Sequence, residues 1–177
     1  MGKSNGRPAA IFTIGHSTRS IGDFVSLLKF NNVSMLVDVR TIPKSLHNPQ
    51  FNKDVLPESL VKEDIGYIHL LELGGLRHAR KDSVNTGWRN SSFRGFADYM
   101  QTDEFKVGIS RLVNLAGDHV PAIMCAEAVP WRCHRTLIAD ALLVRGFEVK
   151  EIIRLNNVRV HTLTKWAKVD GYEITYP

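Results

Sequence analysis

The sequence predicts an α/β fold with a mainly parallel sheet of about five strands and helices on both faces. Short apolar runs alternate with segments whose apolar residues recur at helical spacing, which is the pattern of βαβ units. The runs are almost continuously apolar, as strands are when helices cover both faces of a parallel sheet. With 177 residues, of which 44% are hydrophobic and 23% are charged, the chain has the length and composition of one globular domain.

Each predicted element has a local signal. The five apolar runs that predict strands are residues 10–14, 35–39, 67–70, 120–125 and 147–153. A helix is expected in each of the four intervals between them. Ser20 can cap the first helix, and Pro57 suits the first turn of the second. Gly117 and Gly146 follow the expected ends of the third and fourth helices.

The remaining segments set the limits of the domain. We expect a flexible N-terminal arm over residues 1–9 and a single α/β domain over 10–177. The polar stretch 72–92 predicts a long loop, and loops of that length are usually functional or mobile. Near the C-terminus we expect a short helix over 164–168 and an edge strand over 172–176.

Composition restricts the expected partners and location. The 23 Lys and Arg residues exceed the 18 Asp and Glu residues, and the net charge of +5 favours anionic partners. No apolar run approaches the roughly 18 residues of a membrane helix, and the first residues lack the apolar segment of a signal peptide. Two cysteines do not make a disulfide framework. We therefore expect a cytoplasmic protein that binds an anionic small molecule or nucleic acid and no membrane.

Charged and titratable residues follow the first two predicted strands, and ligands of parallel sheets bind beyond the carboxyl ends of strands. At the first such end stand Gly15, His16 and Ser17, where the glycine permits close approach of a ligand. His16 is either a proton carrier or a packed loop histidine. Asp38 and Arg40 point to the same side of the second strand. They form either a structural ion pair or a site in which Arg40 binds a substrate anion.

The segment richest in such residues joins the fourth strand to the next helix. Its candidates are Cys125, Glu127, Arg132, Cys133, His134 and Arg135. A helix N-terminus attracts anions and lowers the pKa of a nearby thiol, and neighbouring arginines add to this effect. A cysteine is therefore a candidate nucleophile, with His134 or Glu127 as the proton carrier, although the enzyme hypothesis does not require one. The helix position favours Cys133 and the strand-end position favours Cys125, and the sequence leaves both open.

Two other features give alternative hypotheses. One is a zinc or iron site, although the paired ligand spacing of structural zinc sites is absent. Its ligands would be Cys125, Cys133, His134 and His16. The other is a basic loop that tracks a nucleic-acid backbone and stacks a base on Trp88. Its cations are Arg77, His78, Arg80, Lys81, Arg89 and Arg94. The competing interpretation is a solvated loop whose Trp88 packs onto the domain.

Five short motifs occur in a specific order along residues 11–153. They are Thr13-Ile14-Gly15-His16-Ser17, Leu36-Val37-Asp38-Val39-Arg40 with Pro43, Leu73-Gly74-Gly75, Cys125-x-Glu127 and Cys133-His134-Arg135. In this combination the chain resembles the domain of unknown function 488 family of small bacterial and archaeal proteins. The resemblance implies an α/β fold and a shared site at strand ends and loops, and it implies no established activity.

A fainter similarity is to the rhodanese-type sulfurtransferases. They also have a Leu-x-Asp-Val-Arg strand and a strand–cysteine–helix–glycine unit, as in residues 123–146. Their short active loop contains glycine and curls its N–H groups around the cysteine sulfur. Here no glycine lies between Cys125 and Arg135, and Pro130 lacks an N–H donor.

The leading hypothesis is an enzyme, either a hydrolase or a transferase, whose site gathers at one edge of the sheet. Its catalytic candidates are His16, Asp38, Cys125, Glu127, Cys133 and His134. Its substrate-binding candidates are Gly15, Ser17, Arg40, Arg132, Arg135 and Trp88. The expected substrate is phosphate-bearing or nucleotide-like, because arginines and a helix start favour anions. The alternatives are a non-catalytic nucleic-acid-binding protein and a metal-binding domain.

Overall fold

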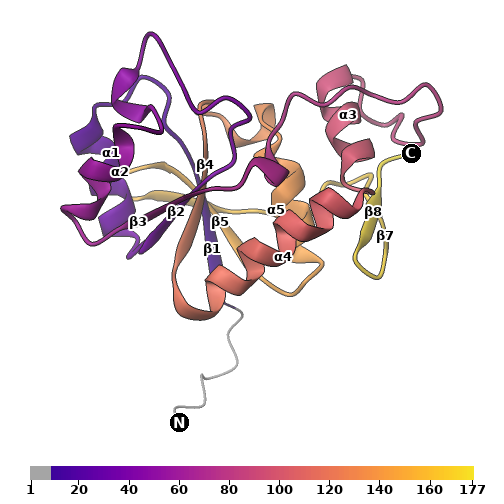
Figure 1. Cartoon of the computed structure of the whole chain (residues 1–177). Coiled ribbons are helices and arrows are strands. Elements are labelled where there is room, and N and C mark those ends of the chain that lie inside the picture. Colours follow the sequence, from indigo (N-terminus) through magenta and orange to yellow (C-terminus); the bar gives the residue numbers. More distant parts are fainter. Residues whose placement is uncertain (1–8) are drawn as a thin grey trace.

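A six-stranded sheet forms the centre of the computed structural model, which describes residues 9–177 (Figure 1). In chain order its strands are β1 (Ala10–Gly15), β2 (Met35–Asp38), β3 (Gly66–His69), β4 (Pro121–Cys125), β5 (Glu148–Arg154) and β6 (Asn157–Val160). Side by side they follow the order β3-β2-β4-β1-β5-β6. The first five strands pair in parallel and β6 is antiparallel to β5, which confirms the predicted α/β class. The predicted arm, residues 1–9, lies outside the described residues except for Ala9.

Helices cover both faces of the sheet, as the sequence predicts. They are α1 (Ile21–Phe30), α2 (Leu56–Val61), α3 (Ser91–Tyr99), α4 (Asp103–Asp118) and α5 (Arg135–Leu143). Figure 1 shows α1 and α2 on one side of the strands and α4 and α5 on the other. Ser20 caps α1 as expected, because its hydroxyl accepts a hydrogen bond from the Asp23 N–H at 3.1 Å. No helix within residues 9–177 is long and apolar enough to cross a bilayer.

Strand side chains alternate between two separate apolar cores. The core under α1 and α2, here called the α1–α2 core, takes Phe12, Ile14, Leu36, Ala122, Met124 and Ile152 from the strands. The core under the other three helices, the α3–α5 core, takes Ile11, Val37, Ile123 and Val149. This period-two alternation with apolar residues on both sides explains why the strands read as continuous apolar runs.

Three local expectations are wrong. Residues 91–99 form α3, although the polar stretch predicted a loop to residue 92; the side chain of Asn90 caps the helix and Phe96 anchors it in the core. Residues 164–168 form no helix. The strand expected over 172–176 exists as β8 (Glu173–Thr175), but its expected place at the edge of the central sheet is wrong. It pairs with β7 (Lys168–Asp170) in a separate hairpin, and the edge strands of the central sheet are β3 and β6.

A buried charged network fixes the chain after β6. His161 contacts Asp140 of α5 through Nε2 at 2.8 Å and Glu151 of β5 through Nδ1 at 2.9 Å. The hydroxyl of Tyr176 donates to the other oxygen of Asp140 at 2.9 Å. Because both ring nitrogens face carboxylates, both must donate, and the imidazole is charged. Burial alone would lower the pKa of His161, but the two carboxylates outweigh it and raise the pKa to about 9.

We expect His161→Gln to destabilise the protein in a pH-dependent way. A histidine whose pKa is higher in the folded state adds stability that is complete below its unfolded pKa of about 6.5 and is lost as pH rises through about 9. The free energy of unfolding of the variant should therefore be about 3 kcal/mol lower than that of the native protein at about pH 6. The difference should be much smaller at about pH 10. Urea unfolding of both proteins across this range measures the difference. A gap that stays constant with pH would show that His161 is uncharged.

Candidate functional site

The alternation of side chains divides the predicted site residues into two groups at the carboxyl edge of the sheet. Leu36 belongs to the α1–α2 core, so Asp38, two positions later, lies on that side together with its partner Arg40. Cys125, at the end of β4, packs against the α3–α5 core. Gly15 pairs with Cys125 in register across β1 and β4, so the two groups are neighbours.

The first group is built on the ion pair between Asp38 and Arg40. Arg40 donates from Nε to Asp38 Oδ1 at 2.9 Å and from Nη2 to Oδ2 at 2.7 Å. The hydroxyl of Tyr67 adds a hydrogen bond to Asp38 at 2.6 Å, and Arg40 also donates to the Phe51 carbonyl at 2.7 Å. Both charged side chains are buried, and their remaining bonds offset the cost of removing them from water. The geometry of Asp38 and Arg40 therefore fits the interpretation that they form a structural ion pair.

His16 bridges this ion pair to the end of β1. Its Nδ1 contacts the Ser17 carbonyl at 2.8 Å, so Nδ1 carries the proton and Nε2 accepts from Arg40 Nη1 at 3.3 Å. The ring stacks on Phe51 with centroids 4.4 Å apart. Burial lowers the pKa of His16, so the ring is neutral at pH 7. Ser17 has a φ of 46°, a strained value for a residue other than glycine.

A small pocket opens beside this group. It has a volume of about 310 Å³, and its polar lining comes from His16, Ser17, Thr18, Arg40, Lys44, Ser45 and Asn48. Asp38 neutralises Arg40, whereas Lys44 has no carboxylate within ion-pair distance in the described part of the chain. The pocket is therefore positively charged. Ala126 also lines it and directly follows Cys125, which brings the pocket next to the second group.

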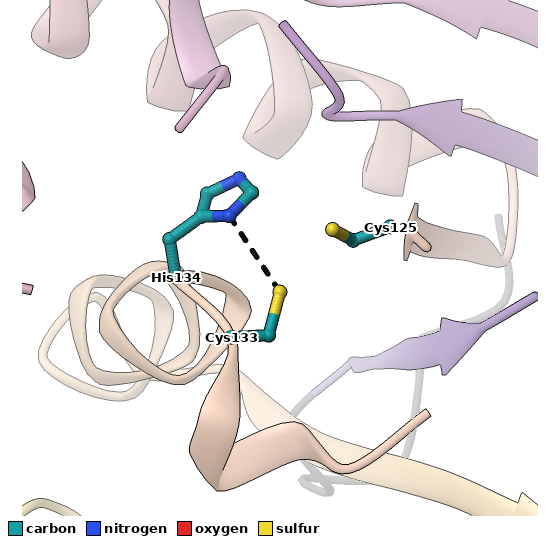
Figure 2. Close-up of side chains that lie close together, drawn as sticks. All are labelled: Cys125, Cys133 and His134. Atoms are coloured by element: carbon teal, nitrogen blue, oxygen red, sulfur yellow. Dashed lines mark hydrogen bonds between the residues drawn. The ribbon is translucent and has the colours of Figure 1, made fainter. Parts of the chain in front are cut away.

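The second group consists of Cys125, Cys133 and His134 (Figure 2). One ligand atom of each, the two sulfurs and a ring nitrogen, lies within 4.8 Å of the others. His134 Nε2 lies 3.0 Å from the Val39 carbonyl and 3.1 Å from the Leu73 carbonyl, so Nε2 carries the proton. The lone pair of Nδ1 then faces Cys133 Sγ at 3.6 Å.

Two close backbone approaches hold this arrangement. A Cβ atom on Gly75 would lie 3.0 Å from His134 Nδ1, so a side chain there would crowd the ring on the side of the thiols. A Cβ on Gly15 would lie 2.0 Å from the Glu127 carbonyl oxygen, which only glycine avoids. Thus the Gly-His and Leu-Gly-Gly motifs position the segment that carries the cysteines.

The electrostatics distinguish the two cysteines, which are free thiols. The neighbouring Cys125 thiol lowers the pKa of Cys133, and although burial opposes this, Arg135 lowers it further. Arg135 donates from Nε to Cys133 Sγ at 3.5 Å. The proximity of Cys133 and burial raise the pKa of Cys125. These shifts favour Cys133 over Cys125 as the thiolate.

The other predicted residues occupy different surroundings. Arg135 is buried and, besides Cys133, its guanidinium donates to Thr13 Oγ1 at 3.3 Å and to the Glu127 carbonyl. The carboxylate of Glu127 accepts from the Val129 N–H at 3.0 Å. Arg132 is exposed. Helix α5 begins at Arg135, so Cys133 and His134 lie in the turn before it rather than within it.

The basic loop is tied to the domain. Trp88 packs against Phe93, Trp166 and Tyr176, as the packed interpretation expects. Three of the loop's arginines also have protein partners: Arg77 lies 3.6 Å above the Tyr99 ring, Arg80 contacts Asp82 at 2.8 Å and Arg94 donates to the Trp88 carbonyl at 2.9 Å.

The comparison with protein families agrees with the motifs. The family model described as domain of unknown function DUF488 matches residues 20–142, more than half of the chain. The chain belongs to this family. The matched region of this DUF488 protein contains Asp38, Arg40, Cys125 and Cys133, whereas His16 precedes it. Curated proteins and solved structures gave no match. The similarity to rhodaneses has no support in these comparisons and stays a prediction.

Sequence reasoning missed two residues that complete the site. Lys44 supplies the pocket's unpaired charge, and its only signal is its place in the loop after β2. Tyr67 bonds Asp38 from β3, which pairs with β2. No sequence pattern marks that contact, because it depends on which strands are neighbours.

We expect Cys125→Ala to raise the pKa of Cys133 by about one unit, because the variant lacks the neighbouring thiol that lowers it and a polar interaction with a thiolate is worth about 1.4 kcal/mol. Ultraviolet absorbance of the thiolate during a pH titration of chelator-treated protein measures the change. Cys133→Ala is the matched control and should lack the low-pH transition. If that transition instead disappears in Cys125→Ala and survives in Cys133→Ala, the assignment of the thiolate is reversed.

Proposed function

We propose that this DUF488 protein is an enzyme, a transferase or hydrolase, that attacks an anionic substrate with the Cys133 thiolate. The observation that carries the proposal is the contact set of Cys133, whose sulfur meets His134 Nδ1 at 3.6 Å and Arg135 Nε at 3.5 Å. A thiolate stabilised by a cation and close to a base is the arrangement of an activated cysteine nucleophile.

His134 is the proton carrier in this proposal. Its Nδ1 lone pair faces Cys133, whereas His16 is engaged with Arg40 and Glu127 bonds the backbone of its own turn. The Cys133 thiolate forms a bond from Sγ to the electrophilic atom of the substrate as the bond to the leaving group breaks, and the leaving group takes a proton from water. His134 Nδ1 then accepts the proton of the water or acceptor molecule that displaces the bound group from Cys133. Throughout, the Nε2–H donates to the Val39 and Leu73 carbonyls, which stabilise the imidazolium.

The substrate in this proposal carries a phosphate or a nucleotide-like anion. The pocket beside Cys125 has an unpaired Lys44, and Ser17, Ser45 and Asn48 contribute further polar groups. Nucleic acid is the alternative anionic partner, but three arginines of the basic loop are already bound to the protein. We include a cytoplasmic location in the proposal, because two free thiols stay reduced there.

Alkylation tests the nucleophile and the anion pocket together. We expect the ratio of the iodoacetate rate to the rate with neutral iodoacetamide to be higher for Cys133 than for a free thiol, because the positive pocket attracts the anionic reagent. Inorganic phosphate should slow the reaction. Lys44→Gln should reduce the preference for iodoacetate by about two- to fivefold, the effect of one exposed charge. Peptide mass spectrometry identifies the modified cysteine and its rate.

The matched control is Lys62→Gln at the C-cap of α2, which removes one exposed positive charge away from the pocket and should leave the preference unchanged. Modification of Cys125 in place of Cys133 would contradict the nucleophile assignment. Equal preference in the Lys44 variant and the native protein would contradict the anion pocket.

A metal centre is a second candidate function, favoured by the orientation of His134. A histidine that binds a metal usually donates its other N–H to a backbone carbonyl, as His134 Nε2 does here. Cys125, Cys133 and His134 would supply three ligands to zinc or iron and leave a fourth position open, as in catalytic zinc sites. His16, the fourth predicted ligand, has both ring nitrogens engaged elsewhere.

If the metal centre is the function, the protein should bind one zinc ion, and elemental analysis of dialysed protein would measure it. Cys125→Ser and His134→Gln should each weaken zinc binding by at least about tenfold, whereas Lys44→Gln should not. Bound zinc should also protect both cysteines from iodoacetamide. Protein that remains metal-free in zinc buffer and alkylates at Cys133 would support the nucleophile in place of the metal.

A further inference from the structure

A second cavity lies away from the cysteines, between α4, the residues that precede β5 and the hairpin β7–β8. Figure 1 shows where these elements lie in the fold. The cavity's volume of about 560 Å³ is in the range of about 300–1,000 Å³ that small-molecule sites occupy. None of the residues discussed for the carboxyl edge of the sheet lines it. Nothing in the proposed function uses this cavity.

The walls of the cavity are mainly apolar. Phe105 and Val113 of α4 line it together with Met100, Phe147 and Ile174. Phe105 and Ile174 are each only 2% exposed, so the floor is part of the α3–α5 core rather than a loose surface. An apolar body such as an aromatic ring or an alkyl chain would bury its surface here.

The charges around the cavity leave one cation unpaired. Lys106 and Glu173 lie 3.6 Å apart and offset each other. Arg145 is half-buried, its guanidinium lies 4.8 Å from the centre of the Tyr172 ring, and its Nη1 donates to the Ala141 carbonyl at 2.8 Å. Among residues 9–177 no carboxylate comes within ion-pair distance of it.

Burial lowers the pKa of Arg145, because removing the charged guanidinium partly from water costs free energy. Partly buried cations are normally compensated by a carboxylate, and here that compensation is missing from the protein itself. An anionic group on a bound molecule would supply it. The apolar walls would therefore bind the apolar part of a ligand, and the unpaired Arg145 would bind an anionic group on the same ligand.

We propose that this cavity binds a small amphipathic anion, whose apolar body packs between α4 and the hairpin β7–β8 and whose carboxylate, sulfonate or phosphate pairs with Arg145. The guanidinium presents several N–H donors in a plane, of which one binds Ala141, so others are available for a forked contact with the anion. This site is independent of the cysteine chemistry, because neither Cys133 nor His134 contributes to it.

The fluorescent probe 8-anilinonaphthalene-1-sulfonate, an aromatic anion, tests the site in the full-length protein. We expect saturable binding to the native protein, and Arg145→Gln should weaken it about tenfold, the effect of losing one charge-assisted hydrogen bond. Decanoate should displace the probe, whereas decyltrimethylammonium, which has the same alkyl chain and the opposite charge, should not. Arg89→Gln is the matched control, because Arg89 is exposed on the loop before α3 and lies outside the cavity.

Ser110→Trp gives a second variant that does not depend on charge. Ser110 lines the cavity from the exposed side of α4, so an indole there fills the space without altering the core, and the probe should no longer bind. Urea unfolding of each variant shows that the fold is intact. Equal binding of the probe by Arg145→Gln and the native protein would overturn the proposal, as would displacement by decyltrimethylammonium as effective as that by decanoate.

Discussion

The hydrogen bonds from His134 Nε2 to the carbonyls of Val39 and Leu73 determine the chemistry of the site. They join three segments that are far apart in sequence: the end of β2, the Leu-Gly-Gly loop and the start of α5. Because they fix the proton on Nε2, they direct the lone pair of Nδ1 at the cysteines. Without them the ring could turn or change tautomer, and neither a proton carrier nor a metal ligand would face Cys133.

Buried charges in this fold have two different kinds of surroundings. Asp38 with Arg40, and His161 with its two carboxylates, have hydrogen-bond partners for nearly every polar atom, so they hold strands and the C-terminal segment in place. Cys133 differs, since among the described residues its sulfur has hydrogen-bond contacts only with His134 Nδ1 and Arg135 Nε. A charged sulfur with few hydrogen-bond partners, in the turn before a helix, is where a substrate can still add an interaction.

The predicted strands could be recognised because each one places apolar residues in both cores. Helix α1 could be recognised because the capping residue Ser20 and the helical spacing of the apolar residues indicate the same helix. Helix α3 was not, because its polar first turn and Gly95 weaken the helical pattern, and the cap by Asn90 is visible only in space. The missed edge strand β6 follows a tight turn in which Asn156 has a φ of 58°. Among the site residues, the motifs located the cysteines and His134, but only tertiary contacts show that Arg135 binds Cys133 instead of solvent.

Charge balance bears on the two candidate functions. With Cys133 as a thiolate and Cys125 as a thiol, the negative sulfur and the Arg135 guanidinium sum to zero. A divalent ion with two thiolates and a neutral histidine is itself neutral, so the buried Arg135 would then carry an uncompensated positive charge. Arg135 cannot turn away, because its other donors are held by Thr13 and the Glu127 carbonyl. The same arginine that lowers the pKa of Cys133 thus opposes a metal at this site and favours the nucleophile.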